Sequence, residues 1–308
     1  MANEATFALT QETALVAGIR FPVQETSAAT RTTSATFALM GGLVPTAVTI
    51  NTGDQAGAVG VLHLATISGL TAARSWTTPA TAQVGEMSGV YCVTDASTTI
   101  ANVLRTKTPA SSGNKIDGVD HSTNVHLTLL SRGELVIYQC VDAAGPHWIT
   151  HRRQLIQSAC RGYLASVASN YYTQSTAVLI PCTTKDYEVG GIFPTAANKY
   201  VSLRRAGIYR FGAACYIIGV TSAAGLAIFL QSRANATPIQ RVSMHQGAMQ
   251  TTAGDRAHNV SCEINVPQSW IGTDDANIGV YVVQNDATRS AHGASGGEFN
   301  WMTCLELL

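Results

Sequence analysis

Residues 199–216, with the sequence KYVSLRRAGIYRFGAACY, decide the fold class of the second half of this chain. After the turn at Ala206 and Gly207, the side chains alternate with a period of two over eight residues. One side of the pattern is aromatic or small and apolar, and the other is mixed: the sets are Tyr209, Phe211, Ala213 and Cys215, against Ile208, Arg210, Gly212 and Ala214. Strict alternation with aromatic and β-branched content predicts a strand that is half-buried against a second sheet.

The same alternation recurs in later stretches of the chain. Residues 258–266, HNVSCEINV, place one apolar set inward and one polar set outward. In residues 299–308, FNWMTCLELL, the odd-numbered side chains share a face, which predicts that the chain ends in a central strand. We expect the core of this region to contain Tyr209, Phe211, Val260, Ile264 and Val280.

The pattern predicts an all-β chain with two domains. From residue 177 onward, eight strand-like segments follow one another without a helical period, which is typical of a two-sheet jelly roll or sandwich. From Thr36 to Ile149, short apolar segments alternate with clusters of turn residues, which predicts a small β-sandwich or barrel-like domain at residues 35–150. The second domain is predicted at residues 170–308.

Three connecting segments complete this prediction. Residues 125–130 and 134–140 are apolar and flank Ser131-Arg132-Gly133, so they are expected to form a hairpin. Residues 151–169 change in character and are predicted to be a linker that holds the one substantial helix. Residues 1–34, rich in Thr, Ala and Ser, are predicted to be an extended arm or short edge strands.

Charge is scarce in this sequence. Only 12% of the residues are charged, and 19 basic residues balance 19 acidic ones. A net charge of zero provides no electrostatic attraction to nucleic acid or to an anionic membrane, so neither is an expected partner. Low charge also fits a surface that is covered by copies of the same chain or by a partner, although neutral drift in composition would produce it too.

The cysteines and the N-terminus indicate the compartment. Seven dispersed cysteines without a CxxC motif do not form a disulfide framework, and buried free thiols are the expectation. The sequence MANEATFALT lacks the basic and apolar segments of a secretory signal. No apolar run reaches the length of a membrane span, so we expect a soluble protein made in a reducing cytoplasm.

A search for catalytic motifs predicts that the chain is not an enzyme. Residues 293–297 match the G-x-S-x-G nucleophile elbow, but that elbow needs a following helix and a downstream histidine. Here a strand pattern follows, and no histidine lies after His292. A flexible glycine loop is the interpretation of this stretch.

Metal ligands and paired carboxylates are also interpreted as structural. His147 and His151 have the i, i+4 spacing of zinc ligands on a helix, but no further ligands lie nearby in sequence. His121 and His126 flank an expected strand start, where solvated or cross-strand roles suffice. The acidic residues that could act in glycoside hydrolysis or calcium binding all lie in turns, where Asp caps its own backbone: Asp117, Asp120, Asp274 and Asp275. No metal and no cofactor is predicted.

Residues 170–308 resemble the trimeric jelly roll of the C1q/TNF family. The resemblance is carried by Thr173-Gln174-Ser175 leading into AVLIPCTTKDYEVGGIF, by AGIYRF at 206–211, by IGVYVVQN at 278–285 and by the terminal FNWMTCLELL. Where the family has F-x-G near its end, this chain has Phe299-Asn300-Trp301. The resemblance implies a homotrimer in which Arg210, Gly212, Tyr216 and Phe299 face the neighbouring copies.

The first domain resembles small β-domains of tailed-phage fibre and decoration proteins. The matching stretches are GAVGVLHLATIS at 57–68, the loop at Ile116-Asp117-Gly118, and residues 125–149. Together the two resemblances imply a non-enzymatic structural protein on a bacteriophage virion, assembled in the host cytoplasm. Such a trimeric capsid decoration or head-fibre protein would dock on the major capsid protein through residues 35–150 and project its jelly roll outward.

Three other functions remain open on the sequence alone. A tail fibre tip would recognise a host-surface glycan or protein through loops such as residues 286–297. A glycan-cleaving tailspike would need two converging carboxylates, for which Asp117 and Asp120 are the candidates. A lectin-like binding module outside any virus would bind sugar through residues 165–308.

Overall fold

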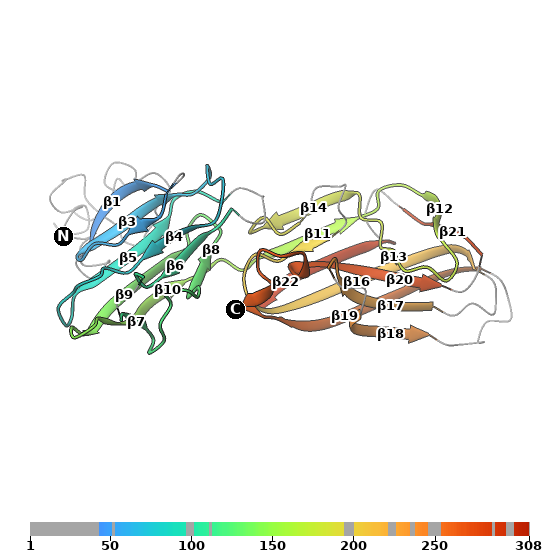
Figure 1. Ribbon diagram of the computed structural model, residues 1–308. Helices are drawn as coiled ribbons and strands as arrows, with labels where there is room; N and C mark the ends of the chain where they lie inside the picture. The colour runs from blue at the N-terminus through green and yellow to red at the C-terminus, as the bar shows by residue number, and fades with distance from the viewer. Residues whose placement is uncertain are drawn as a thin grey trace, which may run out of the picture. The chain divides into compact units, whose positions relative to one another are not determined.

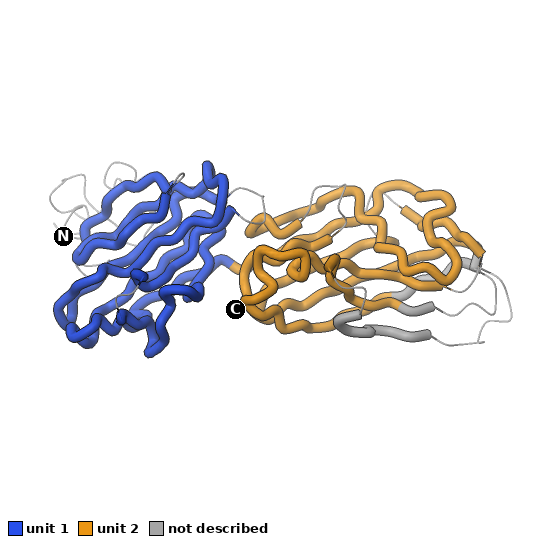
Figure 2. Tube along the Cα trace, in the orientation of Figure 1, with its two compact units in different colours: residues 1–156 blue, residues 157–308 orange. Residues whose placement is uncertain are grey.

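The computed structural model of the chain describes residues 43–50, 53–96, 102–110, 113–193, 200–220, 226–234, 238–245, 254–284, 287–293 and 299–307. It divides into two compact units, residues 1–156 and 157–308, which we call unit 1 and unit 2 (Figure 2). The described residues form strands and two short 3-10 helices, so the prediction of an all-β chain is confirmed. No helix in these ranges has the length and hydropathy needed to cross a membrane. The arm predicted at residues 1–34 lies outside the described residues.

Unit 1 is built from two sheets. Sheet A has the order β1-β3-β5-β9-β10-β7, and sheet B has the order β2-β4-β6-β8. Their strands are β1 (Val44–Thr49), β2 (Gln55–Ala56), β3 (Val61–Thr66), β4 (Arg74–Thr77), β5 (Met87–Cys92), β6 (Leu104–Lys107), β7 (Lys115–Ile116), β8 (Leu127–Leu129), β9 (Leu135–Asp142) and β10 (His147–Gln154).

The first six strands wind as a coil between these sheets (Figure 1). Each strand pairs in parallel with the next strand but one, so that Val44 opposes Val61 in sheet A and Arg74 opposes Leu104 in sheet B. Strands β8, β9 and β10 then close the two sheets by antiparallel pairing. A parallel pair needs a crossover connection, and here the crossover passes through the opposite sheet.

The core of unit 1 lies between sheets A and B and is centred on aromatic side chains. Trp76 stacks on Tyr138 with ring centroids 5.9 Å apart, and both are fully buried. The indole N–H of Trp76 donates to Nδ1 of buried His63 at 2.8 Å, which satisfies the polar atom of a buried indole. Apolar residues from both sheets surround this pair, including Leu104 and Trp148.

The hairpin predicted at residues 125–140 is wrong. Strand β8 pairs with β6 in sheet B, whereas β9 pairs with β5 and β10 in sheet A. The turn between β8 and β9 therefore carries the chain from one sheet to the other. Buried Glu134 holds this turn, because its Oε2 accepts hydrogen bonds from the backbone N–H groups of Leu130 and Ser131.

The helix predicted within residues 151–169 is also wrong. Strand β10 continues to Gln154, and β11 (Ala159–Tyr163) and β12 (Ala168–Tyr172) follow within the same stretch. In β10 a register shift between Thr150 and Arg152 interrupts the alternation of buried and exposed side chains. The side chains after it are exposed, so this end of the strand has no apolar pattern in the sequence. The boundary between the units falls after Ile156, whose N–H donates to Glu134 Oε1 at 3.0 Å.

Unit 2 is a two-sheet jelly roll. Sheet C has the order β12-β21-β16-β22-β11-β14 with β19 on β16, and sheet D has the order β13-β20-β17-β18 with β15 on β20. Its further strands are β13 (Val178–Leu179), β14 (Thr184–Val189), β15 (Val201–Ser202), β16 (Gly207–Val220), β17 (Leu226–Ser232), β18 (Pro238–His245), β19 (Gly254–Val266), β20 (Asn277–Gln284), β21 (Arg289–Ala291) and β22 (Trp301–Leu307). From β16 to β22 the chain passes repeatedly between the sheets, as in a double Greek key.

The core of unit 2 lies between sheets C and D. Tyr209, Phe211, Ile264 and Val280 are buried there, and Val260 is partly buried against the same cluster. The hydroxyl of Tyr209 donates to the backbone oxygen of Arg205 at 2.8 Å, which satisfies it inside the core. The inward residues of β16 thus lie against sheet D, and the even-numbered residues of this strand point to the other side of sheet C.

Candidate functional site

The outer face of sheet C is the surface on which the predicted subunit contacts fall. Strands β16 and β22 pair so that Ile208 opposes Leu307, Arg210 opposes Leu305, Gly212 opposes Thr303 and Ala214 opposes Trp301. Directly opposed residues lie on the same face of a sheet, and the intervening residues Met302 and Cys304 are buried in the core. We call this surface the outer face of sheet C.

Strands β11 and β14 extend this face sideways. Ala159 opposes both Leu305 and Val189, and Tyr163 opposes Trp301. Three apolar or aromatic side chains of the extended face are exposed in the single chain: Ile208 at 47%, Tyr187 at 47% and Val189 at 38%. A contiguous sheet face with exposed large apolar side chains is typical of a surface that another protein covers.

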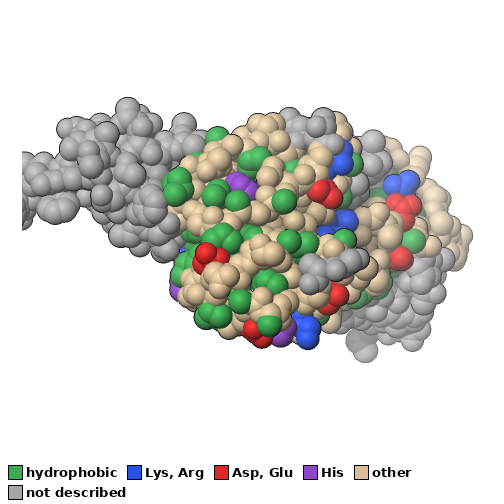
Figure 3. Space-filling model, turned by 60° about the vertical axis from the view of Figure 1, so that its left-hand side comes forward, with side chains coloured by type: hydrophobic (Ala, Val, Ile, Leu, Met, Phe, Trp, Pro, Cys, Tyr) green, Lys and Arg blue, Asp and Glu red, His purple; other side chains and the backbone are tan. Residues whose placement is uncertain are grey.

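The charged side chains that we find on this face are paired. Arg210 donates from Nε and Nη2 to Glu263 Oε1 at 2.9 and 2.6 Å, and Arg161 donates to Asp186 at 2.7 Å. Figure 3 shows a side of the molecule on which the coloured acidic and basic side chains are few and scattered among hydrophobic ones. An outer face with paired charges can be covered without burying an isolated charge.

Gly212 leaves space on this face for the side chains of Trp301 and Thr303 of β22. A Cβ atom at this position would lie 2.7 Å from Thr303 Oγ1 and 3.4 Å from Trp301 Cζ3. The space above Gly212 is therefore occupied by its two neighbours on β22. Gly212 thus contributes to the face through the close packing it permits, since it has no side chain of its own.

Tyr216 and Phe299 meet in an aromatic cluster with His292. Ring centroids lie 5.0 Å apart for Tyr216 and Phe299, 5.1 Å for Tyr216 and His292, and 4.1 Å for His292 and Phe299. Buried Asn300 holds the cluster: its Oδ1 accepts from Tyr172 Oη at 2.8 Å, and its Nδ2 donates to the Tyr216 backbone oxygen at 3.1 Å. The sequence does not indicate this role for His292 or Asn300, because their partners Tyr172 and Tyr216 are distant along the chain.

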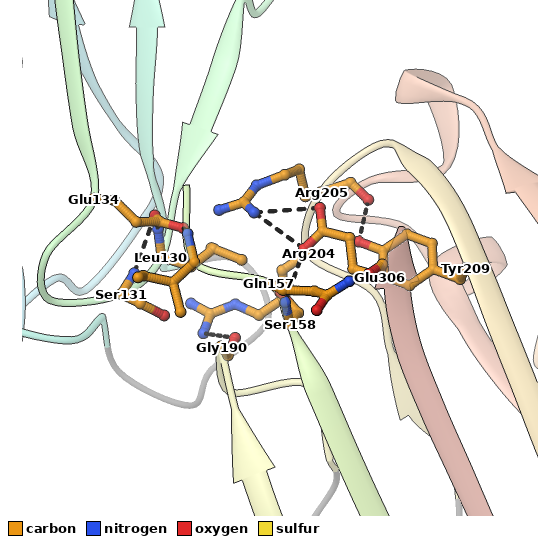
Figure 4. A network of polar contacts seen from close by, with 11 residues as sticks. Leu130, Ser131, Glu134, Gln157, Ser158, Gly190, Arg204, Arg205, Tyr209 and Glu306 are labelled. Atoms are coloured by element: carbon orange, nitrogen blue, oxygen red, sulfur yellow. Dashed lines mark hydrogen bonds and ion pairs between the residues drawn. The ribbon is translucent and has the colours of Figure 1, made fainter. Parts of the chain in front are cut away.

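Glu306, near the end of β22, forms a buried ion pair with Arg205 (Figure 4). Glu306 accepts from Arg205 Nη1 at 3.0 and 3.2 Å, and its Oε2 also accepts from the backbone N–H of Ser158 at 3.0 Å. The Glu306 and Arg205 side chains are only 1% and 6% exposed. Arg204 is buried in unit 2 as well, and it donates to the backbone oxygen of Gly190 at 3.3 Å.

Of the two candidate carboxylates in unit 1, Asp120 caps its own turn as expected, whereas Asp117 bonds to strand β10. Asp117, at a positive φ of 49°, accepts from Thr150 N and Oγ1 at 2.9 and 2.6 Å. Asp120 accepts from the N–H of Ser122 at 2.7 Å, as expected for an aspartate in a turn. In unit 2, the N–H of Asp275 donates to Thr273 Oγ1 at the start of a 3-10 helix, η3 (Asp274–Ala276). The carboxylates of Asp117 and Asp120 therefore stabilise the local structure of unit 1.

The histidines of unit 1 form a contact that the sequence did not indicate. His126 lies against His121 with ring centroids 5.0 Å apart, and its Nε2 is 3.2 Å from Asp117 Oδ2. Its Nδ1 is 2.8 Å from the hydroxyl of buried Tyr138. Burial, together with the charge of His121, lowers the pKa of His126 from 6.5 to about 4, so the ring is neutral at pH 7.

The structure does not gather a metal site from the residues considered for metal binding. Among the described residues, no group of three or more His, Cys, Asp or Glu side chains is arranged to hold a metal ion. His147 and His151 lie on strand β10. The i, i+4 spacing places two ligands one turn apart only in a helix, so it does not indicate a zinc site here. Ser295 of the G-x-S-x-G match lies outside the described residues.

The seven cysteines are present as thiols; six of them are buried, and Cys262 is partly buried against the core of unit 2. Burial raises the pKa of Cys262 to about 11 and raises the pKa values of Cys160 and Cys304 further. A thiol with a raised pKa is a poor nucleophile. The cysteines therefore act as small apolar core residues.

Comparison with known proteins gives similarity only at the level of the fold. No protein-family model matches the sequence, and the search of curated proteins also gives no match. Among solved structures, murine APRIL at pH 8.0 aligns with a TM-score of 0.35 and 12% identity, covering 49% of this chain and 100% of that chain. Eiger TNF from S. frugiperda aligns with a TM-score of 0.31 and 10% identity, covering 50% of this chain and 92% of that one. Both TM-scores are below 0.5, so these alignments are not used to assign the fold. The description of unit 2 as a jelly roll is based on its strand order.

Proposed function

We propose that the chain is a non-enzymatic structural protein that forms a homotrimer through the outer face of sheet C. The observation that carries this proposal is the row of Ile208, Leu305 and Leu307 on that face, continued by Tyr187 and Val189. Burying exposed apolar surface between copies is favourable by about 25 cal/mol per Å². Three copies are proposed because the sequence of residues 170–308 resembles the C1q/TNF family.

The proposed setting is the surface of a bacteriophage virion. It is supported by the resemblance of residues 57–68 and 125–149 to fibre and decoration domains of tailed phages, and by the low charge of the chain. In this proposal unit 1 docks on the major capsid protein and unit 2 projects outward. A tail fibre tip that binds a host-surface glycan is the alternative, and the number of copies per particle separates the two.

Replacing Ile208 by lysine tests the proposed interface. Ile208 is 47% exposed in the single chain, so the substitution is expected to change the stability of unit 2 by less than about 0.5 kcal/mol. At a subunit contact, however, each copy would bury an ammonium group against Leu307 of β22 or its neighbours. Light scattering should then show the mass falling from three chains to one.

A matched control is Val84→Lys. Val84 is 66% exposed and lies in unit 1, so the same change of an exposed apolar residue to lysine is made away from sheet C. This variant should remain trimeric. A monomeric wild-type protein, or an Ile208→Lys variant with the mass of the wild type, would contradict the proposed interface.

A further inference from the structure

Sheet D of unit 2 has aromatic side chains on the face that points away from the core. Strands β13, β20 and β17 lie side by side in this sheet (Figure 1). Along β20, Val280 and Val282 belong to the core, so Gly279 and Tyr281, which alternate with them, point to the other side. Phe229 of β17 opposes Tyr281 and therefore shares this side, which we call the outer face of sheet D.

Three rings meet on this face. The rings of Phe229 and Tyr281 are parallel to within 6°, with centroids 5.8 Å apart, and the ring of Tyr200 has its centroid 6.5 Å from that of Tyr281. Gly279 leaves the space that Tyr200 fills, because a Cβ atom on Gly279 would lie 3.1 Å from two atoms of the Tyr200 ring. We call Tyr200, Phe229 and Tyr281 the sheet D platform. Phe229 is 8% exposed, whereas both tyrosines are partly exposed.

The two tyrosines also present polar atoms at the platform. Their hydroxyl oxygens are 2.9 Å apart, so one hydroxyl donates to the other. A hydroxyl has a single hydrogen and two lone pairs, so the accepting hydroxyl keeps its own hydrogen for a further bond. The platform thus combines apolar ring surface with a donor and several acceptor positions.

Polar side chains lie at one end of the platform. The guanidinium carbon of Arg233 is 5.9 Å from the centroid of the Tyr200 ring, and its Nη1 is 3.9 Å from Asp274 Oδ1. Both side chains are at least half exposed. Gln231 opposes Gly279 and so lies on the same face of the sheet. This end therefore offers amide and guanidinium donors beside a carboxylate acceptor, and the charges of Arg233 and Asp274 cancel.

This combination matches the chemistry of a sugar ring. A pyranose has a face of C–H groups, which packs on the electron-rich face of an aromatic ring, and a rim of hydroxyls, which need both donors and acceptors. A nucleobase would also stack on the rings, but its phosphates require cations, and the arginine here is paired with Asp274. A proline ring would pack on the rings without using the polar side chains at their end.

We infer that the sheet D platform is a binding site for a neutral pyranose sugar. The sugar ring stacks on the exposed surface of Tyr200 and Tyr281, and its hydroxyls bond to Gln231, Arg233 and Asp274. The sugar site does not depend on the proposed trimer, because the trimer contacts are assigned to the outer face of sheet C.

Saturation-transfer NMR of the full-length protein tests the sugar site. The probes are the methyl glycosides of glucose, galactose, mannose and N-acetylglucosamine at millimolar concentration. At least one of them should receive saturation, most strongly on the protons of one face of its ring. Titration of that sugar then gives a dissociation constant for each variant.

Two substitutions at the site should weaken binding. Tyr281→Leu keeps an apolar side chain but removes the flat ring and its hydroxyl, and it should raise the dissociation constant about tenfold or more. Arg233→Ala changes a side chain that is 50% exposed, so the fold is retained, and it should raise the constant about threefold or more. The matched control is Tyr187→Leu on sheet C, where the tyrosine is 47% exposed. This variant should bind like the wild type.

Several outcomes would overturn the sugar site. They are the absence of saturation transfer to all four glycosides, binding that neither Tyr281→Leu nor Arg233→Ala weakens, and an equal loss in Tyr187→Leu. Chemical-shift changes at the platform with a decaproline peptide, but with none of the sugars, would assign it to a proline-rich partner instead. The Ile208→Lys variant should bind the sugar as the wild type does, so a failure of the proposed trimer and a failure of the sugar site are distinguishable.

Discussion

Replacing Glu306 by alanine is expected to lower the free energy of unfolding of unit 2 by about 3–5 kcal/mol. The Glu306 side chain is 1% exposed, and its carboxylate accepts from both Arg205 and the backbone N–H of Ser158. The substitution removes the carboxylate opposite a buried guanidinium and also takes the acceptor from a buried N–H. Each loss leaves a buried polar group without a partner, and water cannot reach the site to replace it. The cost in unfolding free energy is therefore larger than the net contribution of the ion pair to stability.

The Glu263→Ala variant is the matched control for this experiment. Glu263 also pairs with an arginine, Arg210, at 2.6 Å, but both side chains are about half exposed. Exposed pairs contribute about 0–1 kcal/mol, so this variant should unfold almost like the wild type. Hydrogen exchange of peptides from β16 and β22 gives the two free energies. A cost at Glu306 that does not exceed the cost at Glu263 would refute this account of the buried pair.

The strands of unit 2 could be predicted because one face of each is buried. In β16 the apolar side chains of Tyr209 and Phe211 alternate with Arg210 and Gly212, and the structure places the first two in the core and the other two on the outer face. Glu306 could not be predicted as a buried residue. It occupies an inward position of β22, and its burial depends on Arg205, which is distant in sequence.

Unit 1 was harder to predict because its neighbouring strands are not neighbours in sequence. Each turn of the coil passes through both sheets, and successive turns differ in length: Val44 opposes Val61, whereas Leu62 opposes Gly89. The chain therefore has no regular repeat that would reveal parallel pairing. The hairpin prediction for residues 125–140 fails for the same reason, because β8 and β9 are close in sequence but pair in different sheets.

Sheet A also shows a limit of reading strands by alternation. A strand with one buried face alternates between apolar and polar residues, but β3 reads Val-Leu-His-Leu-Ala-Thr and is buried on both faces. Such a run indicates a strand without showing what lies on either side. The burial of Leu62 and Leu64 in a second cluster, apart from the core shared with sheet B, is seen only in the structure.

Unit 1 is expected to lose about 3 kcal/mol of stability as the pH falls from 6.5 to 4. His126 has a pKa lowered to about 4 in the folded protein, chiefly by burial, against 6.5 in the unfolded chain. Within this window the unfolded chain binds a proton that the folded state does not, so protonation favours unfolding. The pKa values of His63 and His121 are lowered in the same direction by burial, and these residues add to the loss. Below pH 4 the folded state also binds the proton on His126, and the contribution of this residue stops growing.

Substituting His126 by glutamine should flatten the pH dependence of unit 1 over this window. Glutamine keeps polar atoms near Asp117 and Tyr138 but does not titrate, so its unfolding free energy should change less between pH 6.5 and 4 even if its value at pH 7 is lower. His151→Gln, at an exposed position of β10, is the matched control for the change of side chain. The measurement is hydrogen exchange of β9 peptides at several pH values, corrected for intrinsic exchange rates. The acid sensitivity is attributed to the burial of His126 against Tyr138. An unchanged slope in His126→Gln would contradict this and assign the sensitivity to other groups.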